Sequence, residues 1–288
     1  MSTERPVLKL DPEAIPTEPK SAATVIVVRD RARSGLEIFF VRRHAKSAFL
    51  GGAVVFPGGK LDAADRGASF IAQCVGTPRR ATDFAADAIN ARELGVCACR
   101  ELLEEAALAL TTTPIDDQHC EDLRAALTSG RPFGDLLTKA KLSLQLNALH
   151  AFGRWVTPKA ESRRFDARFF LAGAPDGQTG KHDDHETTSS VWATPQKMLE
   201  ASAAGEVFLA PPTTRCLELL APAKNIGDAV AIAAAQSLQA VCPEFVASDP
   251  PMLVLPGDPS HSVAETRVSG PSRFVLRDGR FCSEEPGD

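Results

Sequence analysis

The amino-acid sequence predicts a layered fold of mixed α+β or α/β class. Short runs rich in β-branched and aromatic residues alternate with longer stretches of helical periodicity, in the order strands, helix, two strands, strand and helix. Elements in such an order bury their apolar faces by stacking in layers. Apolar residues make up 44% of the 288 residues and charged residues 24%, which is ordinary for a globular protein with a sizeable core.

Strands are predicted where β-branched and aromatic residues cluster between turn-forming residues. The first two such runs predict a hairpin, and the third leads into a turn at Pro57-Gly58-Gly59. A small hairpin near the end is predicted to turn at Asp278-Gly279. The predicted strands cover residues 23–29, 36–42, 53–56, 148–156, 168–172 and 187–193, and the small hairpin covers 272–282.

Helices are predicted where apolar residues recur every three to four positions. Thr194 suits an N-cap and Pro195 suits the first helical position, so one helix is expected to begin there. The segment 66–85 is expected to be irregular, with one short helix around Phe70. The predicted helices cover residues 87–110, 117–128, 133–140, 194–203 and 225–240, and one more follows Pro211-Pro212-Thr213 and ends at 220.

The composition argues against several classes of function. A net charge of −5 disfavours a nonspecific nucleic-acid binder, which would carry a basic excess. No apolar run approaches the roughly 20 residues of a membrane span, and the first residues lack the apolar core of a signal peptide. Seven scattered cysteines suit reduced thiols in a cytoplasm better than a disulfide framework. Cys97 and Cys99 would point apart on a helix, so we expect both to be small core residues.

Three carboxylates share one side of the helix predicted over 87–110. At roughly 100° per residue, Glu101, Glu104 and Glu105 fall within an arc of roughly 100°. Like charges at this spacing repel by about 0.2–0.5 kcal/mol per pair on an exposed helix. A hard divalent cation would remove the repulsion, because it prefers oxygen ligands. The alternative is a solvated acidic face paired with Arg100 or Arg92.

Together with the glycine turn, this helix resembles the Nudix box. That pattern is Gly, five residues, Glu, seven residues, then Arg-Glu-apolar-any-Glu-Glu-any-Gly-apolar. Asp65 stands where the first acid of the box is expected. The residues that match the remaining positions are Gly59, Arg100, Glu101, Leu102, Glu104, Glu105 and Leu108.

The chain departs from the box in three ways. Asp65 replaces the glutamate, and Ala107 replaces the second glycine, so the helix is expected to run on past that position. The third departure is that 34 residues, 66–99, separate the two halves. One branch of the superfamily carries such an insertion, and its first half resembles the run from Pro57 to Arg66 here. That branch comprises the coenzyme A diphosphatase relatives of the peroxisomal type.

The resemblance implies a Nudix fold, which is a mixed β-sheet sandwiched between helices in an α/β/α arrangement. It divides the chain into an N-terminal tail over 1–22 and a Nudix domain over 23–222, with an insertion at 66–90 inside the box. Residues 223–288 would form an appendage made of a helix and the small β-hairpin.

The resemblance also implies a site for a divalent cation, Mg²⁺ or Mn²⁺. Glu104 and Glu105 would be its main ligands, with Glu101 and Gly59 contributing. Arg100 would orient a carboxylate through a bidentate pair. Glu186 is the candidate general base, because members of the family often carry an extra acid on a loop across the site. The alternative for the loop of Glu186 is a solvated polar turn.

Two sets of residues are candidates for substrate binding. Gly58 and Gly59 permit close approach of a phosphate to the backbone. The runs from Phe40 to His44 and from Gly52 to Gly59 resemble part of the coenzyme A motif of the superfamily, although His44 and Ala48 do not match it. Arg42, Arg43 and Lys46 are candidates to meet the extra phosphate of coenzyme A, and the alternative is an exposed basic strand end. A second basic set, with a tryptophan that either stacks on adenine or belongs to the core, comprises Arg154, Arg163, Arg164, Arg168 and Trp155.

Three hypotheses about function follow. The first is metal-dependent hydrolysis of coenzyme A or acyl-coenzyme A to a phosphopantetheine and adenosine 3′,5′-bisphosphate. The second keeps the enzyme but changes the substrate to a nucleotide sugar or dinucleotide. The third is a Nudix-fold binding module without catalysis. The expected partner is a small-molecule diphosphate, with no nucleic acid or membrane, and the resemblance allows a homodimer.

Overall fold

A mixed β-sheet forms the centre of the molecule in the computed structural model, which describes residues 11, 15–45, 47, 50–67, 70–71 and 74–287. Its eight strands within the described residues are β1 (Lys20–Arg31), β2 (Gly35–Arg43), β3 (Val54–Val55), β4 (Gly58–Lys60), β5 (His150–Val156), β6 (Phe165–Gly173), β7 (Thr187–Ala193) and β8 (Ala240–Val241). They hydrogen-bond in the order β3-β2-β1-β6-β5-β8, with β4 added to β1 and β7 added to β2. The sheet is mixed, because β1 runs parallel to β6 and antiparallel to β2.

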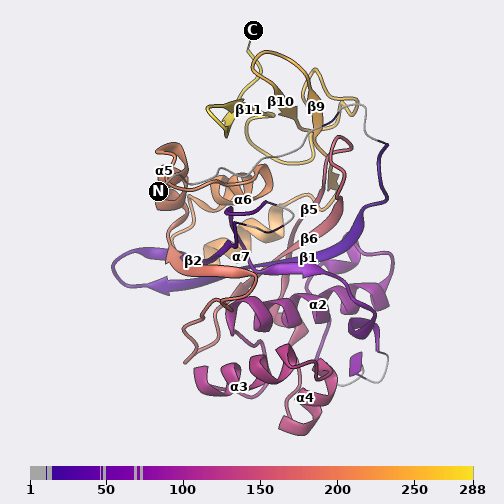
Figure 1. Cartoon of the computed structure of the whole chain (residues 1–288), viewed down its shortest axis with the longest axis vertical. Coiled ribbons are helices and arrows are strands. Elements are labelled where there is room, and N and C mark those ends of the chain that lie inside the picture. The colour runs from indigo at the N-terminus through magenta and orange to yellow at the C-terminus, as the bar shows by residue number, and fades with distance from the viewer. Residues whose placement is uncertain are drawn as a thin grey trace.

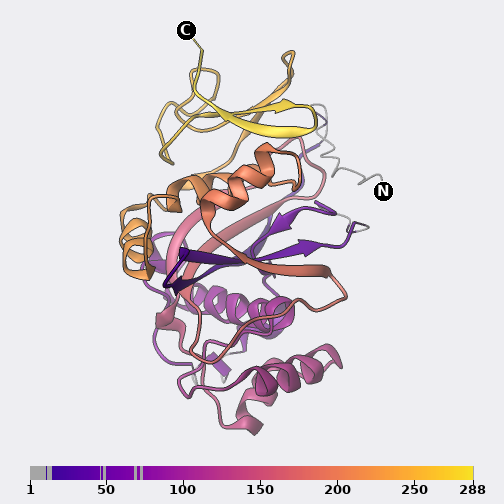
Figure 2. The ribbon, with the colours of Figure 1, turned by 90° about the vertical axis from the view of Figure 1, so that its left-hand side faces the viewer.

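Helices pack on both faces of this sheet. Figure 1 shows α2, α3 and α4 on one side and α5, α6 and α7 on the other, and Figure 2 shows the same layers from the side. These helices are α2 (Ala88–Ala106), α3 (Asp117–Thr128), α4 (Phe133–Ala140), α5 (Pro195–Ala203), α6 (Pro211–Leu220) and α7 (Ile226–Ala235). The expected α/β/α layering is therefore confirmed.

The β-branched run in β1 supplies both cores because successive side chains of a strand point to opposite faces. Val25 and Val27 are fully buried against the layer of α2, whereas Ile26 and Val28 are fully buried against the layer of α6 and α7. A strand that is apolar on both faces must lie inside the sheet. β1 accordingly has neighbours along both of its edges.

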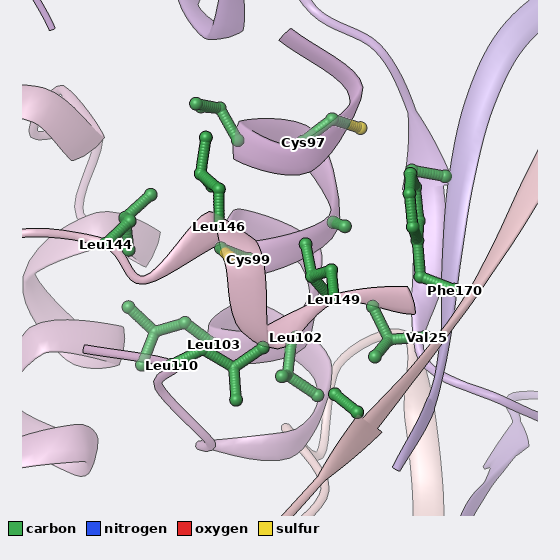
Figure 3. Close-up of a cluster of buried hydrophobic side chains, with 14 of the residues drawn as sticks. Val25, Cys97, Cys99, Leu102, Leu103, Leu110, Leu144, Leu146, Leu149 and Phe170 are labelled. Atoms are coloured by element: carbon green, nitrogen blue, oxygen red, sulfur yellow. The ribbon is translucent and has the colours of Figure 1, made fainter. Parts of the chain in front are cut away.

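Helix α2 is the acidic helix, and its apolar side packs onto the sheet. Leu102 and Leu103 are at most 1% exposed, and Figure 3 shows them facing the leucines that precede β5 and the sheet residues Val25 and Phe170. Cys97 and Cys99 are buried in the same cluster and point apart (Figure 3), as expected for small core residues. The opposite side of α2 is left for its carboxylates.

The C-terminal end of α2 differs from the expectation that the helix would run on. Ala107 adopts the left-handed conformation, with φ 49° and ψ 42°, and its N–H donates to the carbonyl of Leu103. Asp87 caps the other end by accepting from the N–H of Asn90. Alanine thus takes the helix-ending role usually given to glycine, at the cost of a strained backbone.

The predicted turn at Pro57-Gly58-Gly59 is wrong in one respect. Gly58 and Gly59 begin the short strand β4, which pairs with Ala22, Ala23 and Thr24 of β1. Glycine usually indicates a turn, but here it is needed because a Cβ on Gly58 would lie 2.5 Å from the carbonyl oxygen of Ala23. The requirement is for close packing of backbones rather than for a change of chain direction.

Helix α7 is shorter than predicted. It ends at Ala235, and Ala240–Val241 forms β8, which pairs with β5 at the end of the main sheet. Arg80, from the segment between β4 and α2, donates to the carbonyls of Ala233, Ala234 and Gln236. The side chain of Arg80 therefore satisfies carbonyls that the end of a helix leaves without partners.

A second sheet follows the main one. It is antiparallel, in the order β12-β11-β10-β9, and comprises β9 (Glu244–Val246), β10 (Met252–Val254), β11 (Arg273–Arg277) and β12 (Arg280–Glu284). The hairpin predicted at Asp278-Gly279 is present, with both residues at positive φ. Buried Arg215 of α6 donates to the carbonyl of Ser269 and so joins this region to the main body. No helix in the described part of the chain is long and apolar enough to cross a bilayer.

Candidate active site

A cavity of about 740 Å³ opens beside the end of α2. Glu101, Glu104 and Glu105 line it from the helix, and Gly58 and Gly59 line it from β4. The structure thus brings together the two halves of the box, which are separated by the long insertion. Arg43, Arg100, Glu161 and Glu186 also line this cavity.

The contact between β4 and the glutamates is tight. The N–H of Gly58 donates to Oε2 of Glu105 at 2.9 Å. At Gly59, an added Cβ would lie 2.5–2.6 Å from the carboxyl atoms of Glu101. Only a residue without a side chain lets the carboxylate approach the strand this closely.

Arg100 holds three acidic side chains at once. Its Nε and Nη2 donate to the two carboxylate oxygens of Asp65 at 2.7 and 2.8 Å, which is a bidentate pair between buried groups. Its Nη1 donates to Glu101 at 2.8 Å and to Glu104 at 2.7 Å. The carboxylate that Arg100 orients in bidentate fashion is therefore that of Asp65, and Asp65 is absent from the residues that line the cavity.

Crowding and burial make these carboxyls weak acids. Burial raises the pKa of Glu105 to about 8, with a further increase from Glu101 that outweighs Arg43 and the N–H of Gly58. Burial also raises the pKa of Glu101 to about 7, against the lowering by Arg100. The pKa of Glu104 is raised, again first by burial. Carboxyl groups whose pKa values are perturbed in this way cluster at functional sites.

The chemistry of Glu101, Glu104 and Glu105 fits a hard divalent cation, because their donors are carboxylate oxygens. Within the described residues, no group of three or more His, Cys, Asp or Glu side chains is arranged to hold a metal ion. Two of the three glutamates instead accept from Arg100. Glu104 is 33% exposed, more than Glu101 or Arg100, so its side chain is the one best able to exchange the guanidinium for a cation.

The two predicted basic residues separate, because neighbouring side chains on a strand point to opposite faces. Arg43 lines the cavity, and its buried Nε finds no hydrogen-bond partner in the described residues. The structure does not bring Arg42 to the site: its guanidinium reaches the carbonyl of Glu206 at 3.5 Å, and it is not among the residues of the cavity wall. Lys46 lies outside the described residues.

Glu186 stands on the rim of the cavity. Its side chain is 69% exposed and lies 4.0 Å from Nη2 of Arg43. Asp183 fixes the loop by accepting from the N–H groups of Glu186 and Thr187 at 3.0 and 2.9 Å. Arg124 of α3 donates to the carbonyls of Lys181 and His182, the two residues before Asp183. The loop is therefore an ordered turn that places Glu186 on the same cavity as the three glutamates.

Sequence reasoning missed part of the far wall. Glu161, in the loop between β5 and β6, lines the cavity, as do the prolines at the start of α6 and Leu253 of the second sheet. Nothing in the local sequence pattern marks Glu161. Of the second basic set, Arg163 and Trp155 also line the cavity, whereas Arg154 and Arg168 pair with Asp166.

Comparison with known proteins adds to this geometry. Residues 19–219, which are more than half of the chain, match a family model for the NUDT19 Nudix domain. The acyl-coenzyme A diphosphatase NUDT19 of Xenopus laevis is 26% identical over 220 residues, which are 62% of this chain and 58% of that protein. The acyl-coenzyme A diphosphatase NUDT19 of Gallus gallus is 26% identical over 275 residues, which are 77% of this chain and 72% of that protein. The chain thus spans less than two thirds of the Xenopus protein.

One solved structure is similar to this chain in both sequence and architecture. The crystal structure of a NUDIX hydrolase from Alicyclobacillus acidocaldarius is 30% identical to this chain, with a TM-score of 0.64. The match covers 75% of this chain and 96% of that one. The part of the chain that it leaves unmatched is about a quarter.

Proposed function

Because the chain belongs to the NUDT19 Nudix domain family, we propose that it is a divalent-cation-dependent diphosphatase that cleaves coenzyme A or acyl-coenzyme A. The products are a phosphopantetheine and adenosine 3′,5′-bisphosphate. One observation carries the proposal: three glutamates, the diglycine strand and Arg43, whose buried Nε has no hydrogen-bond partner among the described residues, line one cavity. The name of the relatives supports the choice of substrate.

Different residues of the cavity would contact the diphosphate and the cation. Gly59 lets the carboxylate of Glu101 lie directly against β4, and Gly58 donates its N–H to Glu105, so the diphosphate would meet β4 together with these carboxylates. Arg43 offers its free Nε to a phosphate oxygen, which relieves the cost of burying that nitrogen without a partner. Glu101, Glu104 and Glu105 are the residues that would hold Mg²⁺ or Mn²⁺. When bound, such a cation neutralises the diphosphate and lowers the pKa of a water molecule.

Glu186 takes the proton from the attacking water in this proposal. Its exposed carboxylate faces the space beside Arg43, and its charge contributes to raising the pKa of Glu104 and Glu105. Arg100 lines the cavity and fixes Glu101 and Glu104, and Asp65 holds Arg100 from outside the cavity wall. The mechanism therefore needs a rigid arginine–aspartate pair and an exposed carboxylate at the rim.

The test is a panel of diphosphates incubated with Mg²⁺, with Mn²⁺ and with a chelator, followed by product identification. We expect coenzyme A and acyl-coenzyme A to be cleaved only with a cation. Glu104→Gln and Glu105→Gln should each lower the rate at least 100-fold while the thermal unfolding profile is retained. Glu93→Gln, also on α2 but outside the cavity wall, is the control and should keep the parent rate.

Three results would redirect the proposal. Cleavage of nucleotide sugars or dinucleotides but not of coenzyme A would assign the same chemistry to another substrate. Equal rates in Glu104→Gln, Glu105→Gln and the parent would remove the cation from the mechanism. Cation-independent binding without any cleavage would make the chain a binding module.

A further inference from the structure

Glu161 lies in the part of the cavity wall that the proposed chemistry does not use. It sits in the loop that joins β5 to β6, and this loop extends toward the second sheet (Figure 1). β6 and β4 flank β1 on opposite edges, so this wall is about two strand spacings, or roughly 10 Å, from the diglycine strand. The cavity therefore continues well beyond the space that a diphosphate needs.

One oxygen of the Glu161 carboxyl group is buried without a partner. The residue is 6% exposed, and its Oε1 accepts no hydrogen bond within the part of the chain that the structure describes. Comparably buried acids in this chain are all satisfied: Glu105 accepts from Gly58, and Asp258 accepts from Arg273. A buried acceptor without a donor costs about 1–3 kcal/mol. Burial also raises the pKa of Glu161 to about 7.

The loop does not let the carboxyl group escape. Thr157 and Phe165 close its base with hydrogen bonds of 2.9 and 3.0 Å. Arg164 then donates to the carbonyl of Thr157 at 3.0 Å and to the carbonyl of Thr17 at 2.8 Å. Because the backbone on both sides of Glu161 is tied down, the unsatisfied position of its side chain is built into the fold.

The surrounding wall is apolar and brings few donors of its own. Prolines have no backbone N–H, and four of them line this cavity, two at the start of α6. The apolar members of this wall are Trp155, Val156, Pro158, Phe165, Pro211, Pro212, Pro243 and Leu253. Thr157, Arg163 and Thr213 also line this cavity, but none of the described residues donates to Oε1 of Glu161. We therefore look for its donor on a ligand that tolerates an apolar, aromatic environment.

We propose that Glu161 accepts a hydrogen bond from an N–H group on the organic part of the diphosphate substrate, and that it selects among diphosphates in this way. The inference rests on the proposed function for its substrate. Coenzyme A offers N–H groups from two sources, the amine of its adenine and the amides of its pantetheine arm. Both are attached to the diphosphate through several bonds, as the separation across the cavity requires.

The experiment compares the parent with Glu161→Ala, Glu161→Gln and the control Lys159→Gln. Lys159 is exposed in the same loop and is not part of the cavity wall, so its variant removes one charge without touching the site. Steady-state kinetics with coenzyme A gives kcat and KM. Calorimetric titration with 4′-phosphopantetheine and with adenosine 3′,5′-bisphosphate gives a Kd for each half, and neither half can be hydrolysed by a diphosphatase.

We expect Glu161→Ala to raise KM about tenfold or more with little change in kcat. It should weaken binding of one half by a similar factor, and that half identifies the source of the N–H. Glu161→Gln keeps an acceptor oxygen and should lose less. Lys159→Gln should match the parent.

The outcomes separate the two proposals. If the parent cleaves coenzyme A and both Glu161 variants retain its KM and both Kd values, the role of Glu161 is refuted and the function stands. If the parent does not cleave coenzyme A but one half binds more weakly to Glu161→Ala, the function is refuted and the role of Glu161 stands. If neither half binds the parent and coenzyme A is not cleaved, both are refuted.

Discussion

Arg100 grips Asp65 through two parallel hydrogen bonds, although the two residues lie 35 positions apart in the sequence. Both side chains are at most 8% exposed. The same guanidinium donates to Glu101 and Glu104, so the buried pair fixes the positions of two carboxylates on the acidic face of α2. Its two ends belong to the two halves of the sequence motif.

Asp65→Asn should therefore destabilise the fold strongly. The change leaves Arg100 buried without its main counter-charge, and breaking a buried pair costs about 3–5 kcal/mol. Urea unfolding measures the loss. Glu284→Gln is the control, because Glu284 also forms a bidentate pair, with Arg277, but with side chains 50% and 35% exposed. Such an exposed pair contributes little to stability, because solvent screens it. Equal losses in the two variants would contradict this account.

Alanine at the two glycines of β4 should separate stability from activity. A Cβ at Gly58 meets backbone atoms of Ala23 and Thr24, which cannot move aside, so Gly58→Ala should lower the melting temperature. A Cβ at Gly59 meets only the end of the Glu101 side chain, so Gly59→Ala should fold but lose at least tenfold in hydrolysis. Gly67→Ala, with no atom closer than 3.8 Å, is the control. Full activity in Gly59→Ala would show that the position of Glu101 is not critical.

Ala107→Gly should stabilise the protein by about 0.5–1 kcal/mol. Ala107 occupies the left-handed region at φ 49°, which costs an L-residue about 1–2 kcal/mol and costs glycine nothing comparable. Part of the gain is lost to the greater freedom of glycine in the unfolded chain. Ala88→Gly, at the other end of α2 with ordinary helical geometry, should instead destabilise by up to about 1 kcal/mol. Thermal or urea unfolding distinguishes the two, and a loss at Ala107 would contradict the strain.

Several elements could be predicted because their signals are local. The boundaries of α3 and α4 were predicted correctly, as was the start of α5 at Thr194-Pro195, since caps and prolines act on their immediate neighbours. The Nudix resemblance is likewise confirmed by the family match. The strand at Gly58-Gly59 was missed because its cause is the closeness of β1, and β8 was missed because two residues carry no periodicity. Glu161 could not be found, since an unsatisfied carboxyl group is defined only by what surrounds it.

Divalent cations should stabilise the protein more at high pH than at low pH. The pKa values of Glu101 and Glu105 are raised to about 7 and about 8, above their usual value of 4.5. Between about pH 4.5 and 8 the cation-free native state therefore holds protons that the unfolded state has released, and its stability falls as pH rises through that window. A cation competes with those protons. The increase in melting temperature caused by Mn²⁺ should be larger at pH 8.5 than at pH 6.

The variant that tests this is Glu105→Gln, which removes the most strongly shifted carboxyl group of the three. Its melting temperature without a cation should depend less on pH, and Mn²⁺ should raise it less. An increase with Mn²⁺ that is the same at both pH values in the parent would argue against carboxylate ligands in this cavity.

Glu161→Gln should stabilise the free protein at pH 8. The raised pKa of about 7 means that folding of the parent loses stability as pH rises from about 4.5 to 7, because the native carboxyl group resists ionisation. An amide has no such loss, so the variant should gain about 1–3 kcal/mol at pH 8 and much less at pH 5. Thermal melts at the two pH values check the difference. A parent that is the more stable of the two at pH 8 would show that Glu161 has a structural partner.

The long insertion in the motif has a consequence for how such proteins are recognised. Both ends of the insertion, residues 66–99, adjoin the Asp65–Arg100 pair, and the side chain of Arg80 holds its middle to the end of α7. A segment held at these points can change in length between them without moving the two halves of the motif. The separation of the two halves along the sequence is thus set by the insertion, whereas their contact in space is set by the Asp65–Arg100 pair. A search for an uninterrupted string would pass over this chain, whereas a search for two fragments required to meet would retrieve it.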